Sequence, residues 1–333
     1  IFRDKNYPEI LVLEIGADRL GDIKYLTKFL SLKIGVETSV APVHIEFFGS
    51  LENIAKEKSD LVKSLKKEGI AVLNYDDQNV IAMKEKLNCQ VLTFGLLPGA
   101  EFYASAISLA TNQELPFVSF DLNYAGNIYR VNLPSIIAEH LIYSVLPAIA
   151  IGVAYRIELP AIIKTLEGFV APKGRMRVIP GIKYTTIVDD TYNSSPLSAK
   201  KALYQLSRFE PKNDGRKFAV LGDMLELGGI SEQAHQEIGR AVKEYGVDYL
   251  VTVGELSRGI VRGAIDAGFD ADHCFNFSDL KEAGEFVQEK IKTDDIILIK
   301  GSQGMRMEKI VKEIMAEPQK AEELLVRQDK NWQ

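Results

Sequence analysis

Short apolar runs alternate with amphipathic, helix-period segments along most of the chain, and this alternation limits the folds that the sequence can adopt. The apolar runs have strand length and are bounded by turn residues, as in the buried strands of a parallel sheet. A strand, a helix and a further strand in succession form a βαβ unit, whose two strands lie parallel. The pattern therefore predicts an α/β protein with largely parallel sheets.

The first half is expected to begin with three buried strands and two helices. Their predicted ranges are 10–15, 34–40 and 70–74 for the strands, and 22–33 and 51–67 for the helices. From 89 to 133 the runs are shorter and have hairpin-like spacing, which predicts an antiparallel patch attached to the parallel sheet. Two helices should follow, at 136–153 and 160–169.

The second half is expected to be a Rossmann-like domain. Residues 170–181 are rich in proline, glycine and basic residues and predict a domain boundary, giving domains 1–171 and 172–333. Beyond them a βαβ series predicts strands at 184–190, 217–223, 249–254 and 295–301, with helices at 196–209, 231–245, 256–267, 280–290 and 305–316. The charged stretch 317–333 is expected to fray or to end in a short exposed helix.

Composition excludes several classes of protein. The 333 residues carry a formal net charge of −6 with both signs interspersed, so no basic stripe indicates nucleic acid. Cys89 and Cys274 have no metal-ligand spacing and favour a reduced, cytoplasmic protein. The apolar stretch 141–157 is near the minimum length for a membrane span, but polar and helix-breaking residues interrupt it. No membrane insertion is expected.

Two residues of the first half, Glu14 and His44, are possible metal ligands, whereas the sequence alone does not select the nearby Lys58. Glu14 closes the first apolar run, and a carboxylate at the end of a parallel strand can hold Mg²⁺ or simply cap the next loop. His44 lies in a loop before a helix, where a hydrogen-bonded histidine is the simpler interpretation because Mg²⁺ prefers oxygen ligands. Lys58 lies in a charge run that is typical of a solvated helix face.

The densest polar cluster is IVDDTYNSSP at 187–196. Asp189 and Asp190 end a strand, and the polar residues behind them lead into a helix. The cluster suits a nucleotide or peptide pocket, but helix capping explains it equally well. GSQGMRME at 301–308 could cradle an anion or be a plain strand-to-helix turn. The phosphate loop G-x-x-x-x-G-K-[ST] does not occur in the sequence.

Together and in order, several segments resemble the Mur ligases. They are LEIGADRLGDI, APVHIEFFGSLENIAKEKSDL, AVLNYDD, GRMRVIPG, IVDDTYNSSPLSAKKAL, AVLGDMLELG and LIKGSQGMRME. The resemblance implies a central ATPase domain that begins just after its phosphate loop, followed by a Rossmann-like C-terminal domain. It also implies an ATP-dependent amide ligase of peptidoglycan precursor synthesis. The DDTYNSSP and VLGDMLELG segments are typical of the branch that adds D-alanyl-D-alanine to UDP-N-acetylmuramoyl-tripeptide.

The resemblance also implies roles for single residues. Glu14, His44 and Lys58 match the Mg²⁺ ligands of the family, with Lys58 carbamylated so that it offers an oxygen ligand. Lys58, His44 and Arg175 are the implied catalytic residues. The implied ATP contacts are Arg175 near the phosphates, Asp190 at the ribose, Tyr192 and Asn193 beside it, and His140 and Ser144 near the adenine, where many members have asparagine at the position of Ser144.

These inferences leave two alternatives open. One is another ligase of the same superfamily that adds a different amino acid. The other is a non-catalytic nucleotide-binding or scaffold protein without a phosphate loop. A segment carrying that loop is expected to precede Ile1 in the gene product, which should be a monomer, and the chain as given is expected to be inactive.

Overall fold

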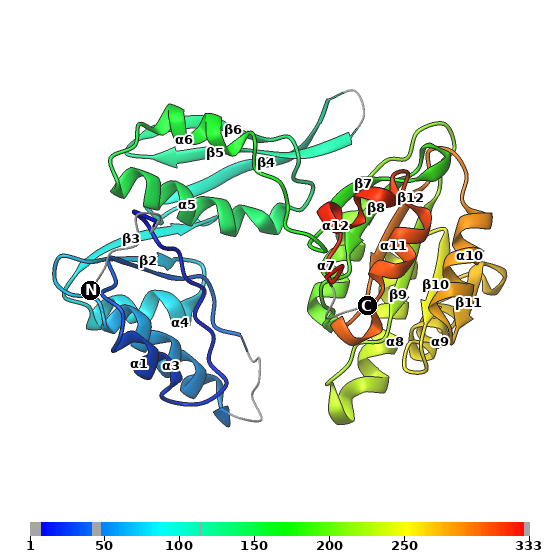
Figure 1. The fold of residues 1–333 in the computed structure, drawn as a ribbon, viewed down its shortest axis with the longest axis horizontal. Coiled ribbons are helices and arrows are strands. Elements are labelled where there is room, and N and C mark those ends of the chain that lie inside the picture. Colours follow the sequence, from blue (N-terminus) through cyan, green and yellow to red (C-terminus); the bar gives the residue numbers. More distant parts are fainter. Residues whose placement is uncertain (1–7, 42–47, 113–114, 330–333) are drawn as a thin grey trace. The chain divides into compact units, whose positions relative to one another are not determined.

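The computed structural model describes residues 8–41, 48–112 and 115–329, which divide into two compact units (Figure 1). The first unit contains Ile1–Ser108, Ser119–Asn132 and His140–Leu166, and the second contains the remaining residues, with its longest continuous part at Glu167–Gln333. The boundary predicted after residue 171 stays a prediction. Each unit is built on its own mixed α/β architecture, and the predicted fold class is confirmed.

The first sheet has six strands in the order β1-β2-β3-β4-β5-β6. Its strands are β1 (Ile34–Glu37), β2 (Ile70–Asn74), β3 (Gln90–Gly95), β4 (Phe102–Asn112), β5 (Leu115–Tyr124) and β6 (Asn127–Leu133). Its helices are α1 (Asp22–Thr27), α3 (Leu51–Lys63), α4 (Gln78–Ile81), α5 (Ile142–Ala154) and α6 (Leu159–Leu166), with short η1 (Ala82–Lys86) and η2 (Glu139–Leu141). The carboxyl ends of the parallel strands β1, β2 and β3 lie along one edge of the sheet.

The antiparallel patch is confirmed for β5 and β6, and β4 attaches it to the parallel sheet through a parallel pairing with β3, Phe94↔Phe102. Only two residues join β5 to β6, and such a short connection can link antiparallel but not parallel strands. Ala125 and Gly126 have φ of 50° and 76°, as a tight hairpin turn requires. The prediction was wrong for β3, which pairs in parallel with β2 through the register Gln90↔Ile70.

The strand predicted at 10–15 is also wrong. The segment is coil, and Ile10, Leu11 and Leu13 are about half exposed while Val12 is 87% exposed. A strand needs a hydrogen-bonded neighbour, and neither described sheet pairs with this segment. The apolar composition of the segment indicated burial, but composition alone cannot supply the neighbouring strand.

The apolar stretch that begins at Leu141 forms α5, which is buried along Ile142, Leu146 and Ile149. Pro147 lies within its 13 residues. In the part of the chain that the structure describes, no helix combines the length and apolarity needed to cross a membrane.

The second sheet is doubly wound and has the order β11-β10-β9-β12-β8-β7. Its strands are β7 (Arg177–Pro180), β8 (Thr186–Asp190), β9 (Lys217–Gly222), β10 (Tyr249–Val253), β11 (Cys274–Phe277) and β12 (Ile296–Lys300). Its helices are α7 (Pro196–Ser207), α8 (Ser231–Glu244), α9 (Arg258–Asp266), α10 (Leu280–Lys290), α11 (Glu308–Ile314) and α12 (Ala321–Leu324), with short η3 to η7 between them. All pairings are parallel except that of β7 with β8. Since β12 lies between β8 and β9, the strand order reverses at their carboxyl ends, as in Rossmann-like folds.

Two strands and the last turn of this unit differ from the sequence prediction. β7 lies inside the predicted linker, because an edge strand tolerates a proline such as Pro180. β11 is only four residues long and was not predicted. The stretch expected to fray or to end in a short exposed helix does form the short helix α12, on which Glu322 and Glu323 are exposed. The helix is also docked, since Ala321 and Leu325 are 3% and 1% exposed.

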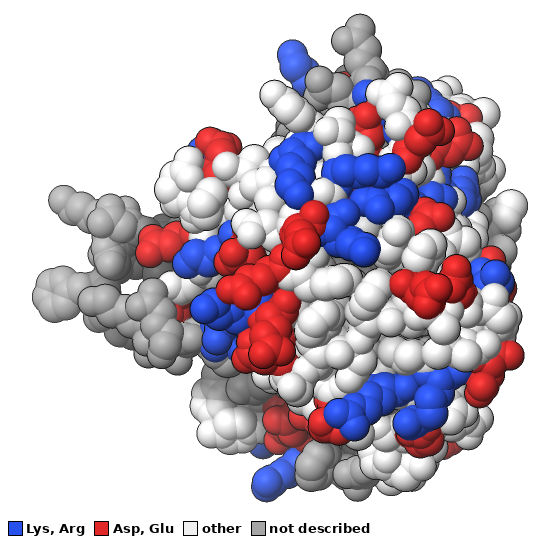
Figure 2. Space-filling model, turned by 90° about the vertical axis from the view of Figure 1, so that its right-hand side faces the viewer, with Lys and Arg blue, Asp and Glu red and all other residues white. Residues whose placement is uncertain are grey.

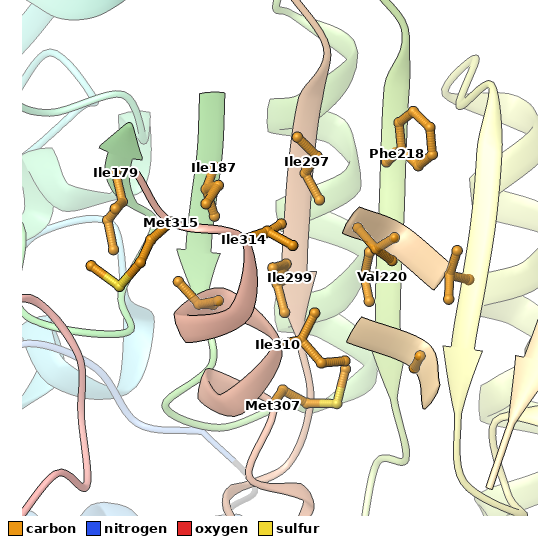
Figure 3. Packing of buried hydrophobic residues seen from close by; sticks show 14 of the residues in the cluster. Ile179, Ile187, Phe218, Val220, Ile297, Ile299, Met307, Ile310, Ile314 and Met315 are labelled. Carbon is orange, nitrogen blue, oxygen red and sulfur yellow. The ribbon is translucent and has the colours of Figure 1, made fainter. Parts of the chain in front are cut away.

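The core of the second unit lies between α10, α11 and one face of the sheet. Figure 3 shows Ile310 and Ile314 of α11 directed toward Ile297 and Ile299 of β12. Ridges of branched side chains from the helix thus fill the pleated surface of the central strand. Basic and acidic side chains lie intermixed on the face of the molecule shown in Figure 2.

Replacing Ile297 with alanine should destabilise the second unit by about 2–5 kcal/mol, because a fully buried isoleucine leaves a cavity that the packed core cannot close. Urea unfolding followed by circular dichroism measures this change. Ile265→Ala on α9 is the matched control, since Ile265 is 43% exposed and its loss should cost less than about 0.5 kcal/mol. Equal losses in the two variants would contradict this account of the core.

Candidate functional site

The segments that follow β1 and β2 are tied together by the last residue of β2 and by a residue just beyond it. Asn74 donates from its amide to the Thr38 carbonyl at 2.7 Å. Asp77 accepts the Val40 N–H at 2.7 Å and also caps α4. These bonds hold the segment 38–40, which leads toward the loop of His44, against the edge of the sheet. His44 itself lies outside the described residues.

Asp76 organises the next part of the same edge. Its carboxylate accepts the N–H groups of Leu96 and Leu97 at 2.6 and 3.1 Å and the Tyr143 hydroxyl at 2.8 Å. Burial and this hydrogen bond raise the pKa of Tyr143 well above its ordinary value. A Cβ on Gly95 would lie 2.5 Å from the Asp76 carboxylate, so only glycine fits there. Asp76 therefore fixes the start of α5 against the end of β3.

The two residues expected near the adenine flank Tyr143. His140 lies in η2 and Ser144 in the first turn of α5, and both are exposed. The two residues therefore lie on successive elements, one just before α5 and one within it. Their contact with a nucleotide stays a prediction.

Lys58 lies half-buried on α3 beside a buried carboxylate that sequence reasoning missed. Glu37 closes β1 and is only 4% exposed. Burial raises the pKa of Glu37 to about 7, and the positive charge of Lys58 opposes that rise. The expected solvated position of Lys58 is therefore wrong in part. The signal that could have revealed Glu37 is an acidic residue at the end of an apolar strand.

The proposed metal ligands are not assembled in the described residues. Glu14 is exposed in the coil that replaces the first predicted strand. Over residues 8–41, 48–112 and 115–329, no three histidine, cysteine, aspartate or glutamate side chains form a possible metal site. An unmodified lysine ammonium has no lone pair for a metal. The donor set of Glu14, His44 and Lys58 stays a prediction.

In the second unit the paired aspartates at the end of β8 have different environments. Asp189 is fully buried and accepts the Thr191 hydroxyl at 2.6 Å and the Gly174 N–H at 3.1 Å. Burial raises the pKa of Asp189 to about 6, against the opposing hydrogen bonds from Thr191. Asp190 instead receives the Lys300 ammonium at 2.6 Å. One carboxyl thus shapes the backbone, and the other forms an ion pair.

Thr191, Tyr192 and Asn193 form a short coil after β8, the wall segment. The Arg175 guanidinium lies 4.0 Å from the centre of the Tyr192 ring, and both side chains are exposed. The Tyr192 N–H donates to the Gly174 carbonyl at 3.0 Å. Gly174 has φ +66°, and a Cβ there would lie 2.9 Å from the Tyr192 nitrogen, so the approach requires glycine.

Asn193 completes the wall segment. Its carbonyl accepts the Lys300 ammonium at 2.9 Å, and its side-chain oxygen accepts the Ser194 N–H at 2.8 Å. The N-cap of α7 is Ser195, which forms a capping box with Ser198. Capping therefore explains the serines but not the tyrosine. The predicted nucleotide residues that the structure brings together are Arg175, Asp190, Tyr192 and Asn193.

The VLGDMLELG segment is fixed at the switch point between β9 and β12. Asp223 accepts the Ser257 N–H at 2.7 Å, and its carbonyl accepts the Ser302 N–H at 3.0 Å. Buried His235 accepts the Met224 N–H at Nε2, which leaves Nδ1 protonated. This histidine is structural. The polar carboxyl edge of β8, β12 and β9 is where α/β folds of this class bind their ligands.

Comparison with known protein families agrees with the α/β fold of the two units. The Mur ligase middle domain matches residues 2–152, and the Mur ligase glutamate ligase domain matches residues 174–303. The two matches cover most of the chain in the order that the two units follow. The chain belongs to the Mur ligase family.

Three of the similar proteins are a named ligase and two solved MurF structures. The chain is 29% identical over 310 residues to the UDP-N-acetylmuramoyl-tripeptide–D-alanyl-D-alanine ligase of Bacillus subtilis. The matched region covers 93% of this chain but only 65% of that protein. A crystal structure of MurF from Acinetobacter baumannii matches with a TM-score of 0.79 at 26% identity, over 90% of this chain and 63% of that one. MurF ligase from Thermotoga maritima in complex with ADP matches with a TM-score of 0.77 at 25% identity, over 95% and 69%.

The environment of Asp189 predicts a titration near pH 6. Since its folded pKa lies above the ordinary 3.8, its contribution to stability is fully present below about pH 3.8 and is lost as the pH rises through 6. Carbon-13 NMR of the carboxyl carbon measures the midpoint. Thr191→Val should raise the midpoint further, because the hydroxyl that favours the ionised form is removed.

Thr186→Val at the other end of β8 is the control and should leave the midpoint in place. A midpoint near 3.8 in the unmodified protein, or no change in the Thr191 variant, would show that Asp189 is not held in this way.

Proposed function

We propose that the chain is part of an ATP-dependent ligase that adds D-alanyl-D-alanine to UDP-N-acetylmuramoyl-tripeptide during cytoplasmic peptidoglycan precursor synthesis. The observation that carries the proposal is the pairing of Arg175 and Tyr192 beside Asp190, at the ligand-binding edge of the second sheet. The Bacillus subtilis relative bears the name of this activity, and the Thermotoga maritima structure contains ADP.

The wall segment suits the nucleotide. A tyrosine that is 42% exposed offers a flat face for stacking, and the Arg175 guanidinium adds a fixed positive charge for phosphate oxygens. Asp190 can accept a ribose hydroxyl while Lys300 holds its carboxylate in place. His140 and Ser144 are proposed to face the adenine.

The proposed reaction has two steps. The terminal carboxylate of the tripeptide attacks the γ-phosphorus of ATP, so that an acyl-phosphate forms as the bond to the leaving ADP oxygen breaks. The amine of D-alanyl-D-alanine then attacks the acyl carbon, phosphate leaves and the amide forms. Arg175 would counter the negative charge that develops on the phosphate oxygens in the first step.

Magnesium is proposed as the metal of the full-length protein, held by Glu14, His44 and carbamylated Lys58. The described residues do not assemble this ligand set, so no step is assigned to the metal. Lys58 and His44 keep their proposed catalytic roles on the family resemblance alone.

Tyr192→Ala should weaken ADP binding about tenfold, because stacking on an aromatic ring contributes on the order of 1–3 kcal/mol. Tyr192→Phe should keep the affinity, since the ring face is retained. Isothermal titration calorimetry with ADP measures both. Tyr204→Ala on α7 is the matched control, because Tyr204 is 43% exposed and lies outside the wall segment. An unchanged affinity in the Tyr192→Ala variant would remove this residue from the nucleotide site.

The full gene product should release phosphate only when the tripeptide precursor and D-alanyl-D-alanine are both present. The 333-residue chain alone should not, because its sequence holds no G-x-x-x-x-G-K-[ST] loop to grip the phosphates. A coupled assay of inorganic phosphate measures both. Turnover by the chain alone would refute the inactive-fragment proposal, and use of a single amino acid in place of the dipeptide would refute the assigned substrate.

A further inference from the structure

The backbone of the wall segment is held by the cations of two buried ion pairs, Lys300 with Asp190 and Arg327 with Glu308. Arg327 lies near the C-terminal end of the described residues. Three successive backbone carbonyls, those of Thr191, Tyr192 and Asn193, each accept a hydrogen bond from a cationic side chain. Lys300 supplies one of these bonds. Arg327 supplies the other two. A coil with no regular partner thus has its carbonyls satisfied by two side chains.

The Arg327 guanidinium bridges three groups, which are two backbone carbonyls of the wall segment and one carboxylate. One terminal nitrogen donates to the Tyr192 carbonyl at 3.1 Å, and the other donates to the Thr191 carbonyl at 2.5 Å and to the Glu308 carboxylate at 2.8 Å. The Arg327 side chain is 5% exposed and that of Glu308 is fully buried. The planar fork of arginine makes this three-way contact possible, whereas a lysine ammonium acts as a point charge.

Glu308 links the bridge to the loop after β12. It is the first residue of α11, and it also accepts the Arg306 guanidinium at 2.6 Å. Arg306 reaches the Arg327 carbonyl at 3.5 Å. Arg306 and Arg327 both have left-handed backbones, with φ of 57° and 54°, which arginine adopts rarely unless its surroundings hold it.

The stretch before Arg327 packs against the second unit, and this packing brings Arg327 within reach of the wall segment. Leu325 and Ala321 are buried in the core of the second unit. Lys173 donates to the Glu322 carbonyl at 2.6 Å, and the Val326 side chain lies 3.2 Å from the position of a Cβ on Gly174. The docked stretch therefore packs against the same Gly174 turn that receives the Tyr192 N–H.

We infer that Arg327 is a positioning residue of the nucleotide site, and that the docked stretch Ala321–Arg327 is part of that site. Arg327 fixes the backbone of Tyr192 on its carbonyl side while Gly174 fixes it on its N–H side, so the ring is presented to the ligand in one orientation. The nucleotide half of this inference rests on the proposed function. The structural half, that Arg327 holds the wall segment, does not.

The test compares Arg327→Ala and Arg327→Lys with the control Arg262→Ala, an exposed arginine that pairs with Glu232 away from the wall. Hydrogen exchange of the Tyr192 amide reports the wall, urea unfolding reports the fold, and calorimetry with ADP reports the ligand. Arg327→Ala should speed exchange at Tyr192 and weaken ADP binding about tenfold, because two charge-assisted hydrogen bonds to the wall are lost. Arg327→Lys should fall between this variant and the unmodified protein, and the control should change neither quantity.

Unchanged exchange at Tyr192 in Arg327→Ala would overturn the inference. Faster exchange with unchanged ADP affinity would overturn its nucleotide half, provided that Tyr192→Ala does weaken ADP binding. If Tyr192→Ala has no effect either, the nucleotide site of the proposed function fails, while the exchange data still decide whether Arg327 holds the wall. Should Arg327→Ala not fold, Arg327→Lys and Glu308→Gln carry the same comparison.

Discussion

The buried ion pair between Lys300 and Asp190 is the contact on which the second unit's polar edge depends. The two residues face each other in the β12–β8 register and lie 2.6 Å apart, at 3% and 8% exposure. Burying two charges costs several kcal/mol, so the pair is stable only with close geometry and further hydrogen bonds. Strand pairing supplies the geometry, and the Asn193 carbonyl supplies a further bond. Removing either partner would leave an uncompensated charge, at a cost of about 3–5 kcal/mol.

The rest of that edge follows from this constraint. Lys300 holds both the Asp190 carboxylate and the Asn193 carbonyl. The two other carbonyls of the wall segment lie close enough together for Arg327 to hold both. The only large aromatic ring of the wall is left outward, with Arg175 over its face. The first unit fixes its own edge in a different way, because there Asp76 and Asp77 accept backbone N–H groups from neighbouring loops. In both units, charged side chains at the carboxyl ends of the strands satisfy the backbone groups of the connecting segments.

Local patterns predicted the regular elements well where they were complete in themselves. The strand 70–74 is reproduced at both ends, and the βαβ series of the second unit is present in order. Predictions failed where a neighbour decides the outcome: the apolar run 10–15 is coil because nothing described pairs with it, and β7 forms inside a predicted linker because β8 pairs with it. At the end of the chain the short helix that the sequence allowed is present, but its docking through the buried Ala321 and Leu325 was not predicted, because charged residues surround these two apolar side chains.

The sequence by itself determined the α/β class, the family resemblance and most of the proposed nucleotide residues, because apolar periodicity and short ordered motifs are local properties of the chain. Only the tertiary structure decided which charges meet. Lys300 reaches Asp190 across 110 positions, Arg327 reaches Thr191 across 136, and buried Glu37 lies within electrostatic range of Lys58 on another element. Such pairs depend on strand order and register, which bring distant residues together. They also depend on burial, because charges and hydrogen bonds interact more strongly in the protein interior than in water.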